Sequence, residues 1–240
     1  MPHIFRFIAE LTGDRSWEIR GDEWTHLTKI LKLTIGSPVE VMDGLGHWGV
    51  GLIVELSGKR AVVEVEKTNF EDAPTTSTIL ITAALKPGSV DDVIGPLTEL
   101  GVDEIWVFLQ DHTSKNRLNA GAEARWERIL LAACKQCTRA RLPRLRVFEN
   151  LARLLETTEE ESCQRYFLDP KAPASLLEVR GVHERVAALI GGEKGLDAKE
   201  CADLIQAGYR PMRLGRHVLR ATTAAVAAAT ILTLRQDVRP

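Results

Sequence analysis

The sequence predicts an α/β protein in which a small N-terminal β-barrel precedes a C-terminal domain built on a parallel sheet. Residues 1–70 alternate apolar and polar side chains with a period of two, which is typical of half-buried strands. From residue 78 onward, apolar runs such as ILITAAL and VAALIGG alternate with helical patterns, as in a parallel sheet covered on both faces. Between them EDAPTTS is polar and aperiodic and predicts a linker, so we expect domains at 1–72 and 73–240.

The N-terminal domain is expected to contain three strands whose apolar residues all fall on one face. These residues are Val39 and Val41, then Val50, Leu52 and Val54, then Ala61, Val63 and Val65. The turn sequences DG at 43–44 and SGK at 57–59 separate the strands as hairpin connections do. A helical segment is predicted at 21–32, where apolar residues share one face. The pattern indicates a small antiparallel barrel or open sheet.

The C-terminal domain is expected to alternate strands with helices. Strands are predicted at 78–85, 104–109, 145–148, 165–168, 186–190 and 210–214. Helices are predicted at 90–100, 121–140, 197–207 and 222–235. Gly101 and Gly208 follow two of these helices, at the position where a glycine commonly ends one.

Composition excludes several classes of protein. The chain has 240 residues, 45% of them hydrophobic and 27% charged, which is ordinary for a globular protein and unlike a disordered or fibrous one. Its net charge of -2 provides no global field for a polyanion, so a nucleic-acid site must be a local patch. Four cysteines and a start without an apolar signal core favour a cytoplasmic location. The run 221–234 is shorter than the roughly 20 apolar residues of a membrane span, so we expect a buried helix.

Two sequence motifs match known binding motifs in spacing but lack the flanking structure that a binding site needs. GLGHWG at 44–49 matches GxGxxG but lies between two alternating strands, so it predicts a hairpin and not a dinucleotide site. Cys134 and Cys137 form a CxxC pair inside a strong helical pattern, without a second pair at zinc spacing, and we expect free thiols. The sequence has no HExxH, GxSxG or P-loop signature, and no metal is expected.

Positive charge is concentrated in residues 125–146. The segment holds one acid, Glu127, and these basic residues: Arg125, Arg128, Lys135, Arg139, Arg141, Arg144 and Arg146. Basic residues that continue from a helix into its exit loop suit a phosphate backbone, because neutralised phosphates release counterions. A solvated helix face explains the same pattern equally well, and both interpretations stay open here.

Two glycine-bearing turns follow predicted parallel strands, where open α/β sheets bind their ligands. The first, LIGGEKGL at 189–196, lies between a strand and a helix, and the second, LGRHVLRATTA at 214–224, precedes the last helix. Glycines let the backbone approach a ligand closely. Each turn by itself is a weak signal.

Taken in order, these segments resemble the SPOUT methyltransferases, and within them the family that methylates N3 of a uridine in bacterial small-subunit (16S) ribosomal RNA. The two turns are similar to the motifs IGPEGG and LGxxILRxETA, and TELGV at 98–102 is identical to a family motif. Gln136 and Arg139 match its QxxR. His26, residues 30–32, Gly36 and the DG at 43–44 fall where the PUA-like barrel of the family has HxxxVLR, a glycine and DG.

The resemblance implies an α/β knot in the C-terminal domain, whose two glycine turns form one cleft for S-adenosylmethionine. It also implies a homodimer that acts on ribosomal RNA or the small ribosomal subunit. The cofactor-binding residues expected on this basis are Leu85, Ile190, Gly191, Gly192, Gly195, Leu196, Leu214, Gly215, Val218, Leu219 and Thr223. The residues expected to contact RNA are Arg6, Lys32, Arg139 and Arg141.

The chain also departs from the family pattern. Gly192 stands where the family has Pro, Lys194 where it has Gly, Thr222 and Lys135 where it has Glu, and Pro96 where it has Lys. Lost acids are candidates for positioning the cofactor or the substrate. Two alternatives therefore stay open: a SPOUT-fold RNA-binding protein that is catalytically altered or inactive, and a SPOUT enzyme with another RNA target.

Methyl transfer to a uracil nitrogen requires donor and acceptor to be held in line and the imide proton to be removed. We expect Arg220, next to the cleft, to stabilise the negative charge that develops on the uracil carbonyl. Its alternative role is to bind phosphate at the start of the last helix. We expect Glu193 either to accept the proton or to satisfy nearby backbone amides.

Overall fold

The computed structural model describes residues 4–84, 90–110, 121–159, 163–179 and 184–237. The chain forms two compact units. Met1–Ala73 together with Cys134–Leu142 make the first, and Pro74–Ala133 together with Pro143–Pro240 make the second. Leu85, one of the expected cofactor-binding residues, lies outside the described residues.

The first unit is a curled, mostly antiparallel sheet. Its strands are β1 (Phe5–Ile8), β2 (Glu10–Leu11), β3 (Ser16–Arg20), β4 (Pro38–Met42), β5 (His47–Ser57), β6 (Arg60–Val65) and β7 (Asn69–Phe70). They pair in the order β1-β4-β5-β6-β3-β2, with β7 beside β5, and only β1 and β4 run parallel. The predicted helical segment is the short α1 (Gly21–Thr25) followed by the π-helical turn η1 (His26–Ile30). GLGHWG forms the β4–β5 hairpin, as the sequence predicts.

The expected core face of β5 is wrong. Three apolar residues that the alternation assigns to the interior are exposed: Val50, Leu52 and Val54. The inward positions of this part of the strand hold Gly49, Gly51 and Ile53. A Cβ at Gly51 would lie 2.1 Å from the backbone oxygen of Glu64, so β5 approaches β6 too closely for any side chain there. The alternation of apolar side chains therefore predicts the wrong buried face. Glycine has no side chain and does not count as apolar, although glycines occupy two of the inward positions.

Residues 134–142 pack into the first unit although they follow most of a helix of the second. This helix, α3, spans Ala122–Cys137. Lys135 forms an ion pair with Glu23, with 2.6 Å between Nζ and Oε1. The backbone N–H of Leu142 donates to the oxygen of Gly44, in the β4–β5 turn. These contacts join a distant segment to the sheet.

The second unit is a six-stranded, fully parallel sheet with helices on both faces. Its strands are β8 (Ser77–Ala83), β9 (Glu104–Phe108), β10 (Arg144–Phe148), β11 (Gln164–Leu168), β12 (Arg185–Ile190) and β13 (Arg210–Met212). Its other helices are α2 (Asp91–Glu99), α4 (Leu151–Glu159), α5 (Ala198–Gln206), α6 (Ala221–Asp237) and the 3-10 turn η3 (Leu176–Glu178). Helix α4 was not predicted from the sequence.

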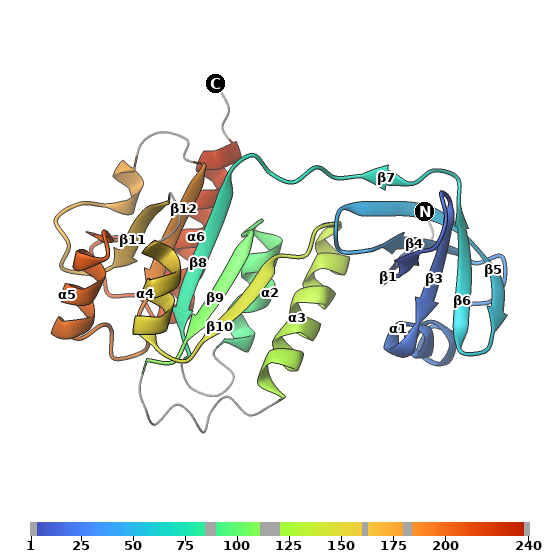
Figure 1. The fold of residues 1–240 in the computed structure, drawn as a ribbon, viewed down its shortest axis with the longest axis horizontal. Helices are drawn as coiled ribbons and strands as arrows, with labels where there is room; N and C mark the ends of the chain where they lie inside the picture. Colours follow the sequence, from blue (N-terminus) through green and yellow to red (C-terminus); the bar gives the residue numbers. More distant parts are fainter. Residues whose placement is uncertain (1–3, 85–89, 111–120, 160–162, 180–183, 238–240) are drawn as a thin grey trace. The chain divides into compact units, whose positions relative to one another are not determined.

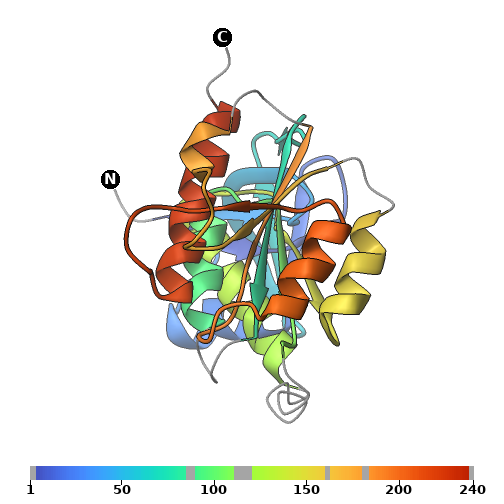
Figure 2. The ribbon, with the colours of Figure 1, turned by 90° about the vertical axis from the view of Figure 1, so that its left-hand side faces the viewer.

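The strand order of the second unit is β10-β9-β8-β12-β11-β13. Figure 1 shows β8 and β12 side by side near the middle of the sheet, and Figure 2 shows α2 and α6 on one face with α4 and α5 on the other. The chain runs outward from β8 through β9 to β10 and then returns to β11 and β12 on the other side of β8. Such a reversal of strand order leaves a crevice at the carboxyl ends of the strands, where α/β proteins bind ligands.

Helix α6 packs against the sheet through Ala225, Ala228, Ala229 and Leu232, which are all buried. Small side chains let the helix lie close to β8 and β12. None of the helices formed by the described residues combines the length and the apolar character that crossing a membrane requires. The knotted path implied by the resemblance stays a prediction.

Candidate functional site

A pocket of about 1010 Å³ lies at the carboxyl ends of β11, β12 and β13 and reaches the start of α2. Its lining residues are Asp91, Asp92, Leu168, Asp169, Pro170, Ile190, Gly191, Gly192, Glu193, Gly195, Met212, Leu214, Gly215, His217, Val218, Leu219, Arg220, Ala221, Thr222 and Ala224. The two glycine turns that the sequence singles out thus meet in one cavity. The turns are distant in the chain, but β11 pairs in parallel with both β12 and β13, which brings the carboxyl ends of these strands together.

The first turn leaves β12 at Ile190 and folds back on itself before α5. The N–H of Gly195 donates to the oxygen of Gly192 at 2.9 Å, and Gly195 has a φ of +74°, in the left-handed region that favours glycine. A Cβ at Gly191 would lie 2.9 Å from both the carbonyl carbon of Gly195 and Cγ of Leu196. Gly191 and Gly195 are therefore required by the fold of the turn itself.

Gln110, which follows β9, holds this turn from outside. Its Oε1 accepts from the N–H of Gly192 at 2.7 Å, and its Nε2 donates to the oxygen of Gly195 at 2.6 Å. The same Nε2 donates to Oε2 of Glu200 at 3.0 Å, and Glu200 forms a capping box with Asp197 at the start of α5. One amide side chain thus fixes both limbs of the turn and connects them to a capped helix.

We expect Gln110→Ala to loosen the turn without unfolding the protein. Two hydrogen bonds to the turn are lost, each worth about 1 kcal/mol net, so amide exchange at 192–196 should accelerate by roughly 30-fold. Hydrogen–deuterium exchange with mass spectrometry measures this directly. Gln206→Ala removes an exposed amide from α5 and serves as the control. Equal exchange in the two variants would contradict the role of Gln110.

The second turn leaves β13 at Met212 and enters α6 at Ala221. A Cβ built on Gly215 meets no other atom within 4 Å, so the cavity is open at this position. Val218 is 78% exposed, more than any other large apolar side chain of the described residues, and Leu219 next to it is also exposed. Apolar side chains that face an open cavity are suited to covering the apolar part of a small ligand.

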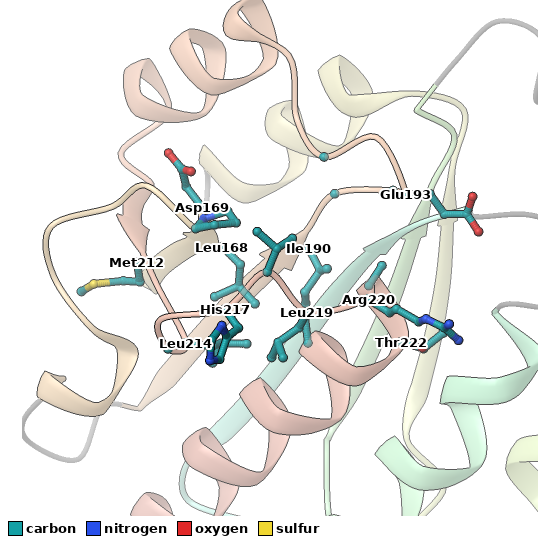
Figure 3. Close-up of a pocket in the computed structure, with 18 of the residues that line it drawn as sticks. Leu168, Asp169, Ile190, Glu193, Met212, Leu214, His217, Leu219, Arg220 and Thr222 are labelled. Carbon is teal, nitrogen blue, oxygen red and sulfur yellow. The ribbon is translucent and has the colours of Figure 1, made fainter.

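Charged side chains lie at both ends of the pocket, and mostly apolar side chains lie between them. Figure 3 shows Asp169 at one end, Glu193 and Arg220 at the other, and Ile190, Leu214 and Leu219 between. Oδ1 of Asp169 accepts from the N–H of Lys171, and the N–H of Asp169 donates to the oxygen of Met212. The bond to Met212 joins the ends of β11 and β13, and the bond from Lys171 holds the carboxylate of Asp169 at the rim.

The structure brings together ten of the expected site residues. Eight expected cofactor-binding residues line the pocket: Ile190, Gly191, Gly192, Gly195, Leu214, Gly215, Val218 and Leu219. Both expected catalytic residues, Arg220 and Glu193, line it too. Leu196 does not: it packs against the core of the second unit. Thr223 is exposed on the first turn of α6 and is not among the lining residues.

Several lining residues were not predicted from the sequence, among them acids at the rim of the pocket. Asp92 and Asp169 line the pocket, as do Met212 and His217. Asp169 directly follows a predicted strand, and a polar residue at the carboxyl end of a parallel strand is a usable signal. Asp91 accepts from Nε1 of Trp126 and forms an ion pair with Arg125, at 3.0 Å between Oδ2 and Nε. Nothing in the sequence around Asp92 predicts that this residue lines the pocket.

The residues expected to contact RNA all belong to the first unit. Lys32 is exposed and has a φ of +53°, which is rare for a lysine. Arg139 and Arg141 are half-buried. Arg6 forms an ion pair with Glu40, and its side chain is only 7% exposed. Because this guanidinium is almost buried in the sheet, the RNA-contact proposal below is limited to the other three.

The first cysteine of the pair, Cys134, is buried and has no reactive character in this fold. Burial raises the pKa of the Cys134 thiol to about 12, so it stays protonated at neutral pH and is a poor nucleophile and a poor metal ligand. Within the described residues, histidine, cysteine and carboxylate side chains form no group of three or more that could hold a metal ion.

The fold and the pocket define an α/β protein with a cavity suited to a small ligand at the carboxyl ends of a parallel sheet and with an additional small β-sheet unit. A family model described as "RNA methyltransferase domain" matches residues 71–233, and one described as "RNA methyltransferase PUA domain" matches residues 19–66. The chain therefore belongs to the RNA methyltransferase family. This confirms the resemblance and the fold class that the ordered motifs predict.

Individual relatives agree over most of the chain. The ribosomal RNA small subunit methyltransferase E of Buchnera aphidicola subsp. Acyrthosiphon pisum is 27% identical over 216 residues, which are 88% of this chain and 85% of that protein. A ribosomal RNA small subunit methyltransferase E from Neisseria gonorrhoeae, solved bound to S-adenosyl methionine, has a TM-score of 0.79 and 22% identity, with 95% of both chains covered. A probable rRNA-methyltransferase from Porphyromonas gingivalis has a TM-score of 0.82 and 25% identity, with 98% of this chain and 99% of that chain covered.

Proposed function

We propose that this protein transfers a methyl group from S-adenosylmethionine to N3 of a uridine in small-subunit ribosomal RNA. The observation that carries the proposal is that the two glycine turns line the same pocket, in a chain that belongs to the RNA methyltransferase family. The named relatives supply the choice of cofactor and RNA. The open pocket, with Arg220 in its wall, favours an active enzyme over a binding protein that has lost its cofactor site.

The character of the pocket fits this cofactor. Among the residues that the structure describes, the lining has one guanidinium, that of Arg220, and four carboxylates: Asp91, Asp92, Asp169 and Glu193. Even with Asp91 paired to Arg125, this described lining has more acidic than basic side chains, which favours a ligand with a cationic sulfonium and ammonium group. The exposed Val218 and Leu219 are suited to contact its apolar surface. The glycine turns offer backbone amides and carbonyls without side-chain obstruction.

S-adenosylmethionine supplies an electrophilic methyl group on a positively charged sulfur. The chain's own tasks are to orient the uracil, to stabilise charge on it and to take up its N3 proton. Arg220 is exposed in the pocket wall, and we assign to it the stabilisation of negative charge on a uracil carbonyl. Glu193 lies at the same end of the pocket and either accepts the proton, directly or through water, or satisfies backbone amides there.

The first unit is the proposed RNA-binding part, with Lys32, Arg139 and Arg141 as contacts to phosphate. A homodimer is part of the proposal, and the composition of α6 supports it. Ala227 and Ile231 are half-buried, and Leu234 is exposed on the part of the helix away from the sheet. A second copy would cover these apolar side chains. A cytoplasmic location follows from a ribosomal substrate.

The proposal is tested by incubating the protein with small ribosomal subunits that lack base methylation and with labelled S-adenosylmethionine. We expect incorporation of label and, because an N3-methyl group blocks base pairing, a new arrest of reverse transcriptase at one uridine. Mass spectrometry of the digested RNA identifies the modified base. Label on another base or on transfer RNA would favour a different RNA target. No incorporation, with cofactor binding intact, would favour a binding protein.

A further inference from the structure

An exposed aromatic cluster lies in the first unit, outside the pocket. Phe70 on β7 is paired directly across from His47 on β5, and their ring centroids are 4.7 Å apart (Figure 1 shows both strands). The guanidinium carbon of Arg141 lies 5.2 Å from the centroid of the Phe70 ring. Phe70 is 52% exposed, and Leu45 at the hairpin tip is 68% exposed. Four side chains with flat or apolar surfaces thus gather in one exposed place.

The β4–β5 hairpin that carries Leu45 and His47 is held by the carboxylate of Asp43. Oδ1 of Asp43 accepts from the backbone N–H of Leu45 at 2.7 Å and from that of His47 at 3.0 Å. Oδ2 of Asp43 lies 2.6 Å from Nδ1 of His47. One carboxylate thereby fixes both the turn and the imidazole ring, so that the ring does not have to be ordered when a ligand binds.

Arg141 is held just as firmly. Its Nε donates to the backbone oxygen of Glu71 at 2.8 Å, and the carboxylate of Glu71 accepts from the N–H of Ala140 at 2.9 Å. Gly46 has a φ of +114°, and a Cβ there would lie 2.9 Å from Nη2 of Arg141 and 2.5 Å from the oxygen of Glu71. Only glycine at position 46 leaves space for the guanidinium against the hairpin.

The guanidinium of Arg141 has hydrogen-bond donors available for a ligand. The carboxylates of Asp43 and Glu71 already accept the hydrogen bonds described above. In contrast, neither terminal nitrogen of Arg141 donates to any residue that the structure describes. An aromatic ring beside a guanidinium with unused donors matches an unpaired nucleotide, whose base stacks and whose phosphate accepts hydrogen bonds.

We propose that Phe70, His47 and Arg141 form a stacking site for an unpaired base of single-stranded RNA. The exposed ring of Phe70 stacks with the base, and Arg141 contacts its edge or the adjacent phosphate. The inference rests on the proposed function in one respect, the choice of RNA as the ligand. It adds a contact of a different kind, because stacking on an aromatic ring tolerates any base and depends little on salt.

The test measures binding of the full-length protein to two labelled oligonucleotides of about 12 nucleotides by fluorescence anisotropy. One is oligoadenylate, and the other is an abasic ribose-phosphate chain of the same length and charge. We expect the wild-type protein to prefer oligoadenylate. Phe70→Ala should weaken oligoadenylate binding by roughly 5- to 100-fold and leave abasic binding unchanged. The slope of log K against log salt should stay the same.

Two further variants keep the test decisive. Phe70→Tyr retains an aromatic face and should bind as the wild type does, whereas Phe70→Leu keeps apolar bulk and should lose most of the preference for bases. Arg139→Ala is the electrostatic control from the same unit. It should weaken both ligands equally and flatten the salt slope by about 0.7, as expected for one phosphate contact on a single strand.

Equal affinity of wild type and Phe70→Leu for oligoadenylate would overturn the stacking site. Equal loss of both ligands in Phe70→Ala would also overturn it, because the ring would then act through the fold or through a different partner. Methylation of small subunits by the wild-type protein is measured separately. A failure there would refute the proposed function while the base preference still stands, so the two outcomes can be told apart.

Discussion

Gly215→Phe is expected to abolish binding of S-adenosylmethionine while the protein stays folded. Gly215 lines the pocket, and a Cβ there meets no other atom within 4 Å. A phenyl group at this position therefore has open space to enter without displacing protein atoms, and it would occupy volume that the cofactor needs. We expect at least ~100-fold weaker binding by isothermal titration calorimetry, equivalent to about 2.8 kcal/mol.

Gly13→Phe is a matched control for this variant. Gly13 belongs to the first unit and is not a lining residue of the pocket, and a Cβ there makes an ordinary contact of 3.8 Å with Cβ of Ser16. Its cofactor affinity should equal that of the wild type. Thermal melting checks that both variants are folded. Wild-type affinity in folded Gly215→Phe would mean that the cofactor binds elsewhere, and the assignment of the pocket would be wrong.

The glycine turns could be located from the sequence because their position has a local signature. Each follows an apolar strand and precedes a helix, and parallel strands bring their carboxyl ends to one edge of a sheet. Ile190 and Leu214, which lie where an apolar strand passes into a glycine turn, can therefore be predicted as site residues from the local sequence. Family resemblance was still needed to predict that two such turns form one pocket.

Residues that act across long separations left no such signature. Gln110 contacts Gly192 and Gly195, which follow it by more than 80 residues, and nothing in FLQ distinguishes it from any strand end. Residues 134–142 similarly join the first unit through pairs such as Lys135 with Glu23. A charge count identifies the lysine as part of a basic segment, but the partner that neutralises it is set by the tertiary fold.

The strand β5 shows how a local rule fails. Alternation correctly identifies a strand, but the face depends on which residues can be accommodated where β5 meets β6. Gly51 occupies an inward position because any Cβ there would collide with backbone atoms of Glu64. The apolar residues at the alternate positions, such as Leu52, are then left outside. A close backbone approach of this kind is a property of two strands together and cannot be read from one.

Arg220→Ala is expected to lower kcat by about 10²–10³-fold, or roughly 3–4 kcal/mol, if the guanidinium stabilises charge on the uracil. Arg220 is exposed in the pocket wall, and no ion-pair partner for it occurs among the described residues. Its charge is therefore available to a substrate. Cofactor affinity by calorimetry should change little. Arg220→Lys keeps the charge but not the planar donor pair, so it should recover only part of the rate.

The dependence of this loss on pH separates a catalytic from a merely structural role. Arg220 is proposed to favour the ionised uracil, so without it a smaller fraction of bound uracil is ionised at neutral pH. Raising the pH ionises the imide without help from the protein, and the ratio of wild-type to Arg220→Ala kcat should fall as pH rises. A phosphate-binding role predicts instead a raised KM for RNA and a ratio of kcat values that is constant with pH. That result would remove Arg220 from the chemistry and leave it as an anchor at the start of α6.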